Sequence, residues 1–186
     1  MKRLFDFCFS LVLIIVLMSP ILIIAIAVKL TSPGPILYWS DRVGKQNRLF
    51  SMPKFRSMKM DTPAVATHLL EDPRSVLTPI GDFLRKSSLD ELPQLWNILK
   101  GDMSFVGPRP ALFNQADLIK LRTEQHIDSL IPGLTGLAQI NGRDALPIPE
   151  KVALDKQYLQ LQSFQLDLKI LWLTLMKVIK KEDVSH

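Results

Sequence analysis

Cysteine and histidine are scarce in this chain of 186 residues. It contains one cysteine, Cys8, and three widely separated histidines, His68, His126 and His186. A single cysteine cannot form an intrachain disulfide, and histidines so dispersed lack the spacing of a metal site. Disulfide scaffolds and modules built on Cys/His zinc sites are therefore excluded. Cys8 lies in an apolar run, where we expect a small buried side chain rather than a reactive thiol.

Acidic residues are outnumbered by basic ones. The chain has 18 Asp+Glu against 23 Lys+Arg, which gives a net charge of +5. This balance predicts anionic partners, among them lipid head groups, phosphorylated ligands and nucleic acid. The aromatic residues are not interleaved with the basic ones, as a platform for stacking bases would require. We therefore expect no nucleic-acid partner, and a non-catalytic basic binding module is the least favoured hypothesis.

What the sequence does contain is a long uncharged run, "FCFSLVLIIVLMSPILIIAIAV", at residues 7–28. A straight helix of that length spans about 33 Å, which is enough to cross a hydrocarbon core of about 30 Å. A cleaved signal peptide fits poorly, because the run is too long and has no obvious small-x-small cleavage site. The run therefore predicts a membrane anchor.

Ser19 and Pro20 interrupt this run. An interior proline removes a helical hydrogen bond and bends the helix. Basic residues flank both ends, Lys2 and Arg3 before the run and Lys29 after it, so the positive-inside tendency favours neither orientation. The residues alone are equally compatible with a spanning helix and with a re-entrant helix that breaks at Ser19-Pro20 and returns to the same face.

The rest of the chain predicts one compact α+β domain, since helical and strand-like patterns follow one another without a repeat or a long linker. We expect a short β-hairpin from "ILYWS" and "RLFSMPKFRSM", helical pieces over 80–100, 111–128 and 148–181, and Gly101 as a helix stop. The glycine-rich "PGLTGLAQINGRD" predicts a loop or a short strand, and a short helix is expected around "AVATHLLE".

The last helical segment, "FQLDLKILWLTLMKVIKK", is rich in leucine and lysine. A basic amphipathic helix of this kind can lie in the membrane interface. It can equally be a core helix whose lysines are solvated. Both interpretations remain open from the sequence.

The octapeptide "SSLDELPQ", residues 87–94, places Asp90 and Glu91 side by side before Pro93. In one structural interpretation Ser88 caps a helix and Glu91 closes a capping box. In another Asp90 is the cap and Pro93 lies in the first turn. Each needs only one of the two carboxylates. A catalytic interpretation gives them two distinct roles, because neighbouring helical residues point about 100° apart.

The surroundings of the two carboxylates favour the catalytic interpretation. Arg85 precedes them, and Arg109 follows in "GPRP", where two prolines restrict the backbone. An arginine on so rigid a turn is positioned to hold a phosphate with its planar fork. An aspartate can attack phosphorus once Mg²⁺ offsets the repulsion between the two anions. The pattern therefore favours phosphoryl chemistry.

The run "SLDELPQLWNILKGDMSFVGPRP", with "KFRSM" upstream and "PGLTGLAQINGRD" downstream, closely resembles the small monotopic phosphoglycosyl transferases, a family of bacterial sugar transferases. The resemblance extends over nearly the whole chain. It implies transfer of a phosphosugar from a UDP-sugar to a polyprenol phosphate, usually undecaprenyl phosphate, with release of UMP. That step begins the assembly of a membrane-linked glycan.

The resemblance also implies roles for individual residues. Asp90 would be the nucleophile, contact Mg²⁺ and carry the phosphosugar covalently, while Glu91 would assist proton transfer or position the second substrate. Arg109 would bind the diphosphate, with Arg85 beside it. Further substrate-binding positions implied by the family motifs are Lys54 and Arg56, which would shape the site, and Gln139, Asn141 and Arg143, which would face the nucleotide.

For the membrane, the resemblance implies a re-entrant helix over residues 1–30, broken at Ser19-Pro20, and a catalytic domain over residues 31–186. The two would form one monotopic unit in contact with lipid, on the cytoplasmic face of the bacterial inner membrane.

One departure is Gln46-Asn47, where many relatives carry a glycine, so we assign no role there. The sugar and the oligomeric state cannot be read from the sequence, and a homo-oligomer remains open. The alternative activity is a membrane-anchored, metal-assisted phosphodiester or diphosphate hydrolase.

Overall fold

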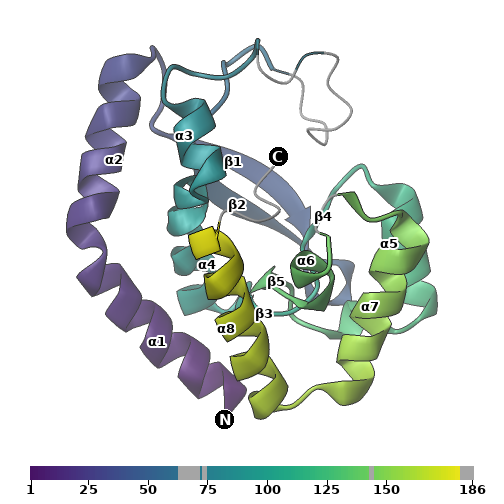
Figure 1. Ribbon diagram of the computed structural model, residues 1–186. Helices are drawn as coiled ribbons and strands as arrows, with labels where there is room; N and C mark the ends of the chain where they lie inside the picture. The colour runs from purple at the N-terminus through teal and green to yellow at the C-terminus, as the bar shows by residue number, and fades with distance from the viewer. Residues whose placement is uncertain (63–71, 73–74, 143–144, 181–186) are drawn as a thin grey trace.

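The structure is a computed structural model that describes residues 1–62, 72, 75–142 and 145–180 (Figure 1). Its helices are α1 (Lys2–Val16), α2 (Met18–Thr31), α3 (Gly81–Lys86), α4 (Leu95–Lys100), α5 (Ala116–Glu124), α6 (Leu137–Ile140), α7 (Ile148–Leu161) and α8 (Phe164–Lys180), with 3-10 helices η1 (Lys45–Asn47), η3 (Leu89–Gln94) and η4 (Ile127–Ser129). Its strands are β1 (Leu37–Val43), β2 (Leu49–Phe55), β3 (Ser104–Val106), β4 (Ala111–Leu112) and β5 (Gly133–Thr135). This mixture confirms the predicted α+β class. The short helix expected around residues 64–71 falls outside the described residues.

The predicted hairpin is present as β1 and β2. The two strands pair antiparallel, with Leu37 opposite Phe55 and Val43 opposite Leu49. β4 pairs with the other edge of β1, which gives the strand order β2-β1-β4. A second, smaller sheet joins β3 and β5 in parallel. These sheets hold two segments that matter below: β2, which carries Lys54, and the loop between β3 and β4, which carries Arg109.

The N-terminal hydrophobic run forms α1 and α2, which meet at Leu17 with a bend of 62°. Ser19 and Pro20 lie in the first turn of α2, where a proline costs little because its N–H would be unpaired there in any case. The break predicted at Ser19-Pro20 therefore falls at Leu17, two residues earlier. No single described helix is long and apolar enough to cross a membrane, whereas the bent pair reaches that length and composition.

One face of this bent pair packs on the rest of the molecule. The start of α1 is fixed by polar contacts, because Lys2 pairs with Asp167 at 2.5 Å and Asp6 accepts a hydrogen bond from the Phe105 amide at 3.2 Å. Further along, Ile24 and Val28 of α2 are buried in a cluster that includes Phe55 and Leu84. The pair is therefore anchored at both ends on the domain (Figure 1).

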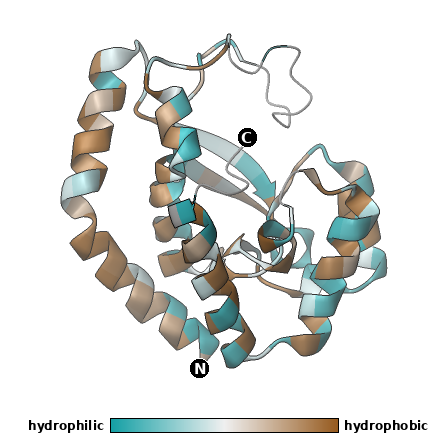
Figure 2. Cartoon of the chain, in the orientation of Figure 1, coloured by the Kyte–Doolittle hydropathy of each residue, from teal (hydrophilic) through white to brown (hydrophobic). Residues whose placement is uncertain are grey.

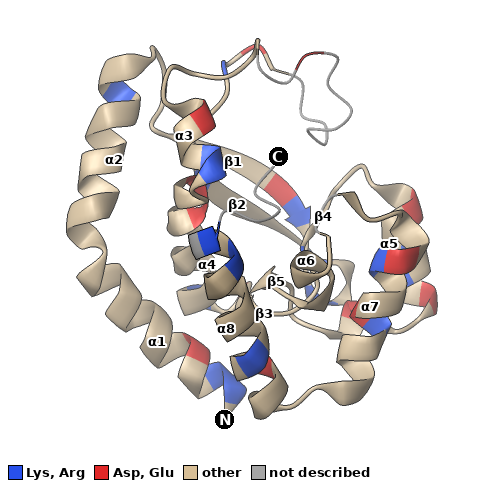
Figure 3. Cartoon of the chain, in the orientation of Figure 1, with Lys and Arg blue, Asp and Glu red and all other residues tan. Residues whose placement is uncertain are grey.

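The opposite face of α1 and α2 is apolar and exposed. Hydrophobic residues occur along the whole length of the pair (Figure 2), and the exposed ones include Phe7, Val12, Ile15, Val16, Leu22, Ile23, Ile26 and Leu30. Charged residues stand only near the ends of the pair (Figure 3). Cys8 lies on this outer face, which corrects the expectation that it is buried: the inward positions of α1 are taken by Asp6 and Ser10.

The segment 80–100 contains the two predicted helical pieces. After α3 the chain passes through the serines into η3, which continues directly into α4. Gly101 ends α4 with a φ of 99°, in the left-handed region that favours glycine. The guanidinium of Arg3 bonds the carbonyls of Ile98 and Leu99 at this helix end, so it supplies the donors that the last turn lacks.

Two predictions for the C-terminal half need correction. The glycine-rich segment 132–144 contains not only a strand but also the short helix α6. The single helix expected over 148–181 is divided into α7 and α8, because the Ser163 hydroxyl accepts a hydrogen bond from the Leu166 amide at 3.2 Å and starts a new helix.

The structure bears out the core interpretation of α8 for one of its faces. Ile170 is fully buried, and the Thr174 hydroxyl lies 2.7 Å from that of Thr135, so one face belongs to the core. Trp172 and Leu175 are more than half exposed on another face. The helix therefore covers the core and presents apolar side chains outward at the same time.

Candidate active site

The predicted catalytic segment lies where two parts of the core meet. η3 packs against β2, between a small cluster around Phe55 and Leu84 and a larger one around Leu95 and Ile98. Lys54 of β2 consequently faces η3. Because both segments are held by buried side chains on either side, the charged groups between them have fixed positions.

Glu91 joins two of the predicted cationic residues. Its Oε1 atom accepts a hydrogen bond from Lys54 Nζ at 2.9 Å and another from Arg109 Nη2 at 3.3 Å. The three side chains come from β2, η3 and the loop between β3 and β4. They are mostly buried, with 14% of the Glu91 side chain exposed. In the sequence, Lys54 lies 37 positions before Glu91 and Arg109 lies 18 positions after it, so the fold brings these three residues together.

Asp90 lies beside this cluster and is buried, with 6% of its surface exposed. Its Oδ1 atom has no hydrogen-bond partner among the described residues, which is rare for a buried carboxylate. Burial raises the pKa of Asp90 to about 6, the nearby cations Lys54, Arg85 and Arg109 oppose the rise in pKa, and Glu91 adds to it. The carboxylate is therefore poorly solvated, close to positive charge and ionised at neutral pH.

Neither structural interpretation of "SSLDELPQ" describes the fold. Ser88 does precede η3, but its side chain makes no capping hydrogen bond, and it adopts a φ of 55°. Glu91 reaches Lys54 and Arg109, so no capping box forms. Asp90 lies within η3 and caps no helix. Asp90 and Glu91 instead lie next to each other in η3 and share the nearby cations Lys54 and Arg109.

The other predicted residues are placed at varying distance from this cluster. Arg85 lies in the last turn of α3 and acts electrostatically on Asp90. Arg56 is buried and binds the turn after α2 through the backbone carbonyls of Ser32 and Pro33. Its guanidinium is therefore directed at the turn after α2 rather than at Glu91.

The "QINGR" segment contacts the arginine loop through one residue. Gln139 is buried and its amide donates to the carbonyl of Gly107 at 3.4 Å. Asn141 is exposed and bonds the Leu137 carbonyl of its own helix at 2.7 Å. Arg143 lies outside the described residues. Gln139 is thus the predicted nucleotide-facing residue that the structure places next to the "GPRP" turn.

Two residues that the sequence analysis did not single out are connected to this turn, one directly and the other through the first. Arg122 of α5 donates from Nη1 to the carbonyl of Arg109 at 2.8 Å. Its Nε and Nη2 atoms bond Asp155 of α7 at 3.0 and 2.6 Å. Neither residue lies in a motif, and they are 33 positions apart. The only sequence signal was one arginine and one aspartate at inward positions of otherwise ordinary helices.

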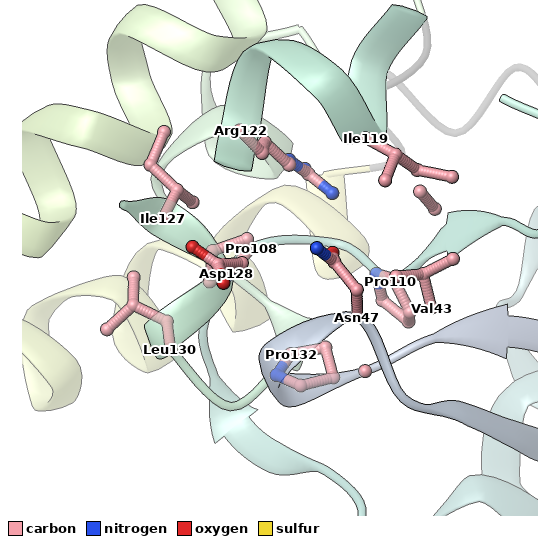
Figure 4. A pocket seen from close by; sticks show the side chains of 12 residues that line it. Val43, Asn47, Pro108, Pro110, Ile119, Arg122, Ile127, Asp128, Leu130 and Pro132 are labelled. Atoms are coloured by element: carbon pink, nitrogen blue, oxygen red, sulfur yellow. The ribbon is translucent and has the colours of Figure 1, made fainter. Parts of the chain in front are cut away.

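Behind this turn is a small pocket of about 30 Å³, lined by Pro108, Pro110, Arg122, Asn47 and neighbouring residues (Figure 4). Neither Asp90 nor Glu91 lines it. Its volume suffices for a water molecule but not for a sugar nucleotide. We therefore locate the candidate active site at the Asp90–Glu91 cluster. We assign the pocket no role in substrate binding.

A desolvated carboxylate beside several cations suits nucleophilic attack on a phosphorus centre. The carboxylate supplies the electron pair, and the cations stabilise the negative charge of the phosphate oxygens. The class of enzyme that this arrangement indicates is a group-transfer enzyme acting on phosphate esters.

Comparison with known proteins identifies the family within this class of enzymes. The family model described as bacterial sugar transferase matches residues 1–181, which is nearly the whole chain. This protein belongs to the bacterial sugar transferase family. The resemblance drawn from the sequence motifs is thereby confirmed.

Several relatives are similar over nearly the full chain. It is 41% identical to an uncharacterized sugar transferase of Bacillus subtilis, EpsL, over 100% of this chain and 91% of that protein. It is 43% identical to the UDP-glucose:undecaprenyl-phosphate glucose-1-phosphate transferase of Escherichia coli, over 89% of this chain and 37% of the relative. It is 35% identical to the undecaprenyl-phosphate galactose phosphotransferase of Salmonella typhimurium, over 98% of this chain and 41% of the relative. The chain therefore spans about two fifths of the length of the last two proteins.

Proposed function

We propose that this protein transfers a phosphosugar from a UDP-sugar to a polyprenol phosphate, undecaprenyl phosphate, and releases UMP. The names of the Escherichia coli and Salmonella relatives support sugar-phosphate transfer to this lipid. They act on different sugars, glucose and galactose, so the shared segment does not identify the sugar. The single observation that carries the proposal is the buried Asp90 carboxylate among Lys54, Arg85 and Arg109, with one oxygen that no described residue bonds.

In the first half-reaction the Asp90 carboxylate attacks the phosphorus that bears the sugar. A bond forms between Asp90 and this phosphorus, and the bond from phosphorus to the bridging oxygen of the diphosphate breaks, so that UMP leaves. Arg109 and Lys54 offset the charge of the diphosphate oxygens as the leaving group develops. Glu91 keeps these two cations in place, since its Oε1 bonds both.

In the second half-reaction an oxygen of the polyprenol phosphate attacks the same phosphorus. The bond to Asp90 breaks, the carboxylate is regenerated, and the product is a polyprenol diphosphate sugar. Because the two bulky substrates use one site in turn, the mechanism predicts ping-pong kinetics.

The residues present fit a magnesium ion. Mg²⁺ in phosphate-processing sites is usually held by one or two carboxylates, with water and substrate phosphate supplying the other ligands. The unpartnered Oδ1 of Asp90 offers one such oxygen, although no cluster of three acidic, His or Cys ligands occurs among the described residues. A bound Mg²⁺ would neutralise phosphate charge and so lower the repulsion between two anions.

The exposed apolar face of α1 and α2 supports a position at the membrane. Apolar side chains along its whole length, such as Ile15, Ile23 and Leu30, are more than half exposed, and a continuous apolar surface of this kind marks a membrane or protein contact. We propose that the bent pair enters the lipid and returns to the cytoplasmic face, which keeps the active site at the boundary where donor and acceptor meet.

The experiment is a transfer assay with a UDP-sugar labelled in the sugar, polyprenol phosphate and the purified protein in detergent. We expect the label to move to the lipid, and we expect Asp90→Asn to lower the rate by at least about 10³-fold. Asp82→Asn is a matched control, because Asp82 is an exposed aspartate of α3 that pairs with Lys86 of the same helix. Label released as free sugar phosphate would instead indicate a hydrolase and contradict the proposal.

A further inference from the structure

The turn that carries Arg109 is held through its carbonyl groups. Gly107 O accepts from Gln139, Pro108 O accepts from the Gly133 amide at 2.9 Å, and Pro110 O accepts from Arg42 at 3.3 Å. The Arg109 carbonyl itself accepts from Arg122 at 2.8 Å. Four successive carbonyls are thus bonded by four different segments. Since the two prolines cannot donate, these contacts largely determine the position of the turn.

The donor on the Arg109 carbonyl is itself fixed by a buried partner. Arg122 and Asp155 are almost completely buried, with 8% and 1% of their surfaces exposed. Two of the guanidinium nitrogens bond one Asp155 oxygen, and the third reaches the turn. A guanidinium is planar, so fixing two of its nitrogens also fixes the direction of the third. The side chain of Arg122 extends from α5 toward the turn (Figure 4).

We propose that Arg122 and Asp155 are positioning residues, which hold the backbone of Arg109 so that its guanidinium meets the donor diphosphate. This rests on the proposed function, in which Arg109 binds that diphosphate. Neither residue touches the substrate in this arrangement. They act on catalysis through Arg109 alone, and a small displacement of a substrate-binding group can lower the rate about 100-fold.

A purely structural role is the competing explanation, and it predicts a different result. Replacing a buried ion pair by apolar residues of similar volume is often neutral or stabilising. The double variant Arg122→Met/Asp155→Leu therefore removes the bond to the Arg109 carbonyl while the domain stays folded. If the pair served stability only, this variant would keep its activity.

Another hydrogen bond between α5 and α7 does not involve the turn, and its removal provides a matched control. Lys156 of α7 bonds Gln125, at the end of α5, at 2.6 Å on the surface. The double variant Lys156→Met/Gln125→Leu removes this contact between the same helices. We expect its kcat/KM for the UDP-sugar to equal that of the wild type within about twofold.

The experiment measures kcat/KM for the UDP-sugar in four proteins: wild type, Arg122→Met/Asp155→Leu, Arg109→Ala, and the combination of all three changes. We expect the apolar pair to lower kcat/KM about 100-fold in the wild-type background and less than about twofold in the Arg109→Ala background. Equal losses in both backgrounds, or full activity of the apolar pair, would overturn the proposal. Asp155→Asn, which keeps the shape of the side chain, should show a smaller loss with the same dependence on Arg109.

A second readout separates this proposal from the proposed function. The Gly107 amide donates to Thr135 O and the Gly133 amide to Pro108 O, both at 2.9 Å, so hydrogen exchange at these amides reports on the turn without any turnover. We expect exchange about tenfold faster in Arg122→Met/Asp155→Leu, with the β1–β2 amides unchanged. A wild type that transfers no phosphosugar would refute the proposed function, and unchanged exchange at the turn would refute the positioning role.

Discussion

Among single side chains, Asp90 should have the largest effect on activity. Its pKa is raised to about 6, chiefly by burial, while nearby cations keep it from rising further. A nucleophile must be deprotonated, so kcat/KM should fall about tenfold for each pH unit below about 6. Lys54 lowers this pKa, and Lys54→Met should therefore move the acid limb of the pH profile to higher pH. A profile that is flat from pH 7 to pH 5 would contradict this assignment.

The burial that raises the pKa of Asp90 also lowers the free energy of unfolding when Asp90 is ionised. Its pKa is about 6 in the folded protein against an ordinary value of 3.8, so between these pH values the folded state holds a proton that the unfolded chain has lost. Ionised Asp90 thus destabilises the fold fully above pH 6, and the effect vanishes below about pH 4. Asp90→Asn should stabilise the protein by about 2–3 kcal/mol at pH 7, while abolishing activity.

Unfolding of the wild type and Asp90→Asn in detergent, at pH 7 and at pH 4, checks this prediction. The gain should be present at pH 7 and nearly absent at pH 4. The same gain at both pH values would show that it has another source than the charge on Asp90.

At the level of single residues, the sequence was informative where chemistry is local. Asp90, Glu91, Lys54 and Arg109 lie in short motifs, and the structure brings them together. Arg122 could not be found this way, because its importance comes from one bond to a backbone carbonyl. Such a bond depends on how two helices pack, and residue spacing does not report it.

At the level of elements, the bent pair of α1 and α2 carries the clearest prediction. If it enters and leaves the bilayer on one side, residues near its two ends share that side. Leu4 and Leu30 are 69% and 80% exposed, so single cysteines there, in a Cys8→Ser background, can be labelled. A membrane-impermeant maleimide should label both from the cytoplasmic side of vesicles.

Ser19→Ala/Pro20→Ala extends this test. Alanine restores the missing backbone donor at position 20 and favours a straight helix, so the variant should place a fraction of residue 30 on the far side. Labelling of residue 30 only from the side opposite residue 4 in the wild type would refute the re-entrant arrangement.

Elements with strong local signals could be predicted, and those set by context could not. The β1–β2 hairpin follows from aromatic and β-branched residues, and the stop at Gly101 from a glycine at positive φ. The helix α6 was missed because glycines surround only four helical residues. The capping role expected for Ser88 failed since Glu91 finds stronger partners in Lys54 and Arg109.

For the whole molecule, the arrangement joins the apolar pair of α1 and α2 to the candidate active site. α2 packs on β2, the strand that carries Lys54, and Arg56 of the neighbouring segment holds the turn at the end of α2. The apolar pair and the candidate active site are therefore adjacent parts of the fold. The hydrophobic run predicted a membrane anchor and the motifs predicted an enzyme, but this direct connection follows only from the three-dimensional packing.

The central claim is that Asp90 becomes esterified to the phosphorus of the donor. Intact-protein mass spectrometry after incubation with a UDP-sugar, in the absence of lipid acceptor, tests it directly. We predict a mass increase of one sugar phosphate, located on the peptide that contains Asp90. The increase should disappear when polyprenol phosphate is added. Full transfer activity with no mass change at any time, or an adduct that persists in Asp90→Asn, would contradict it.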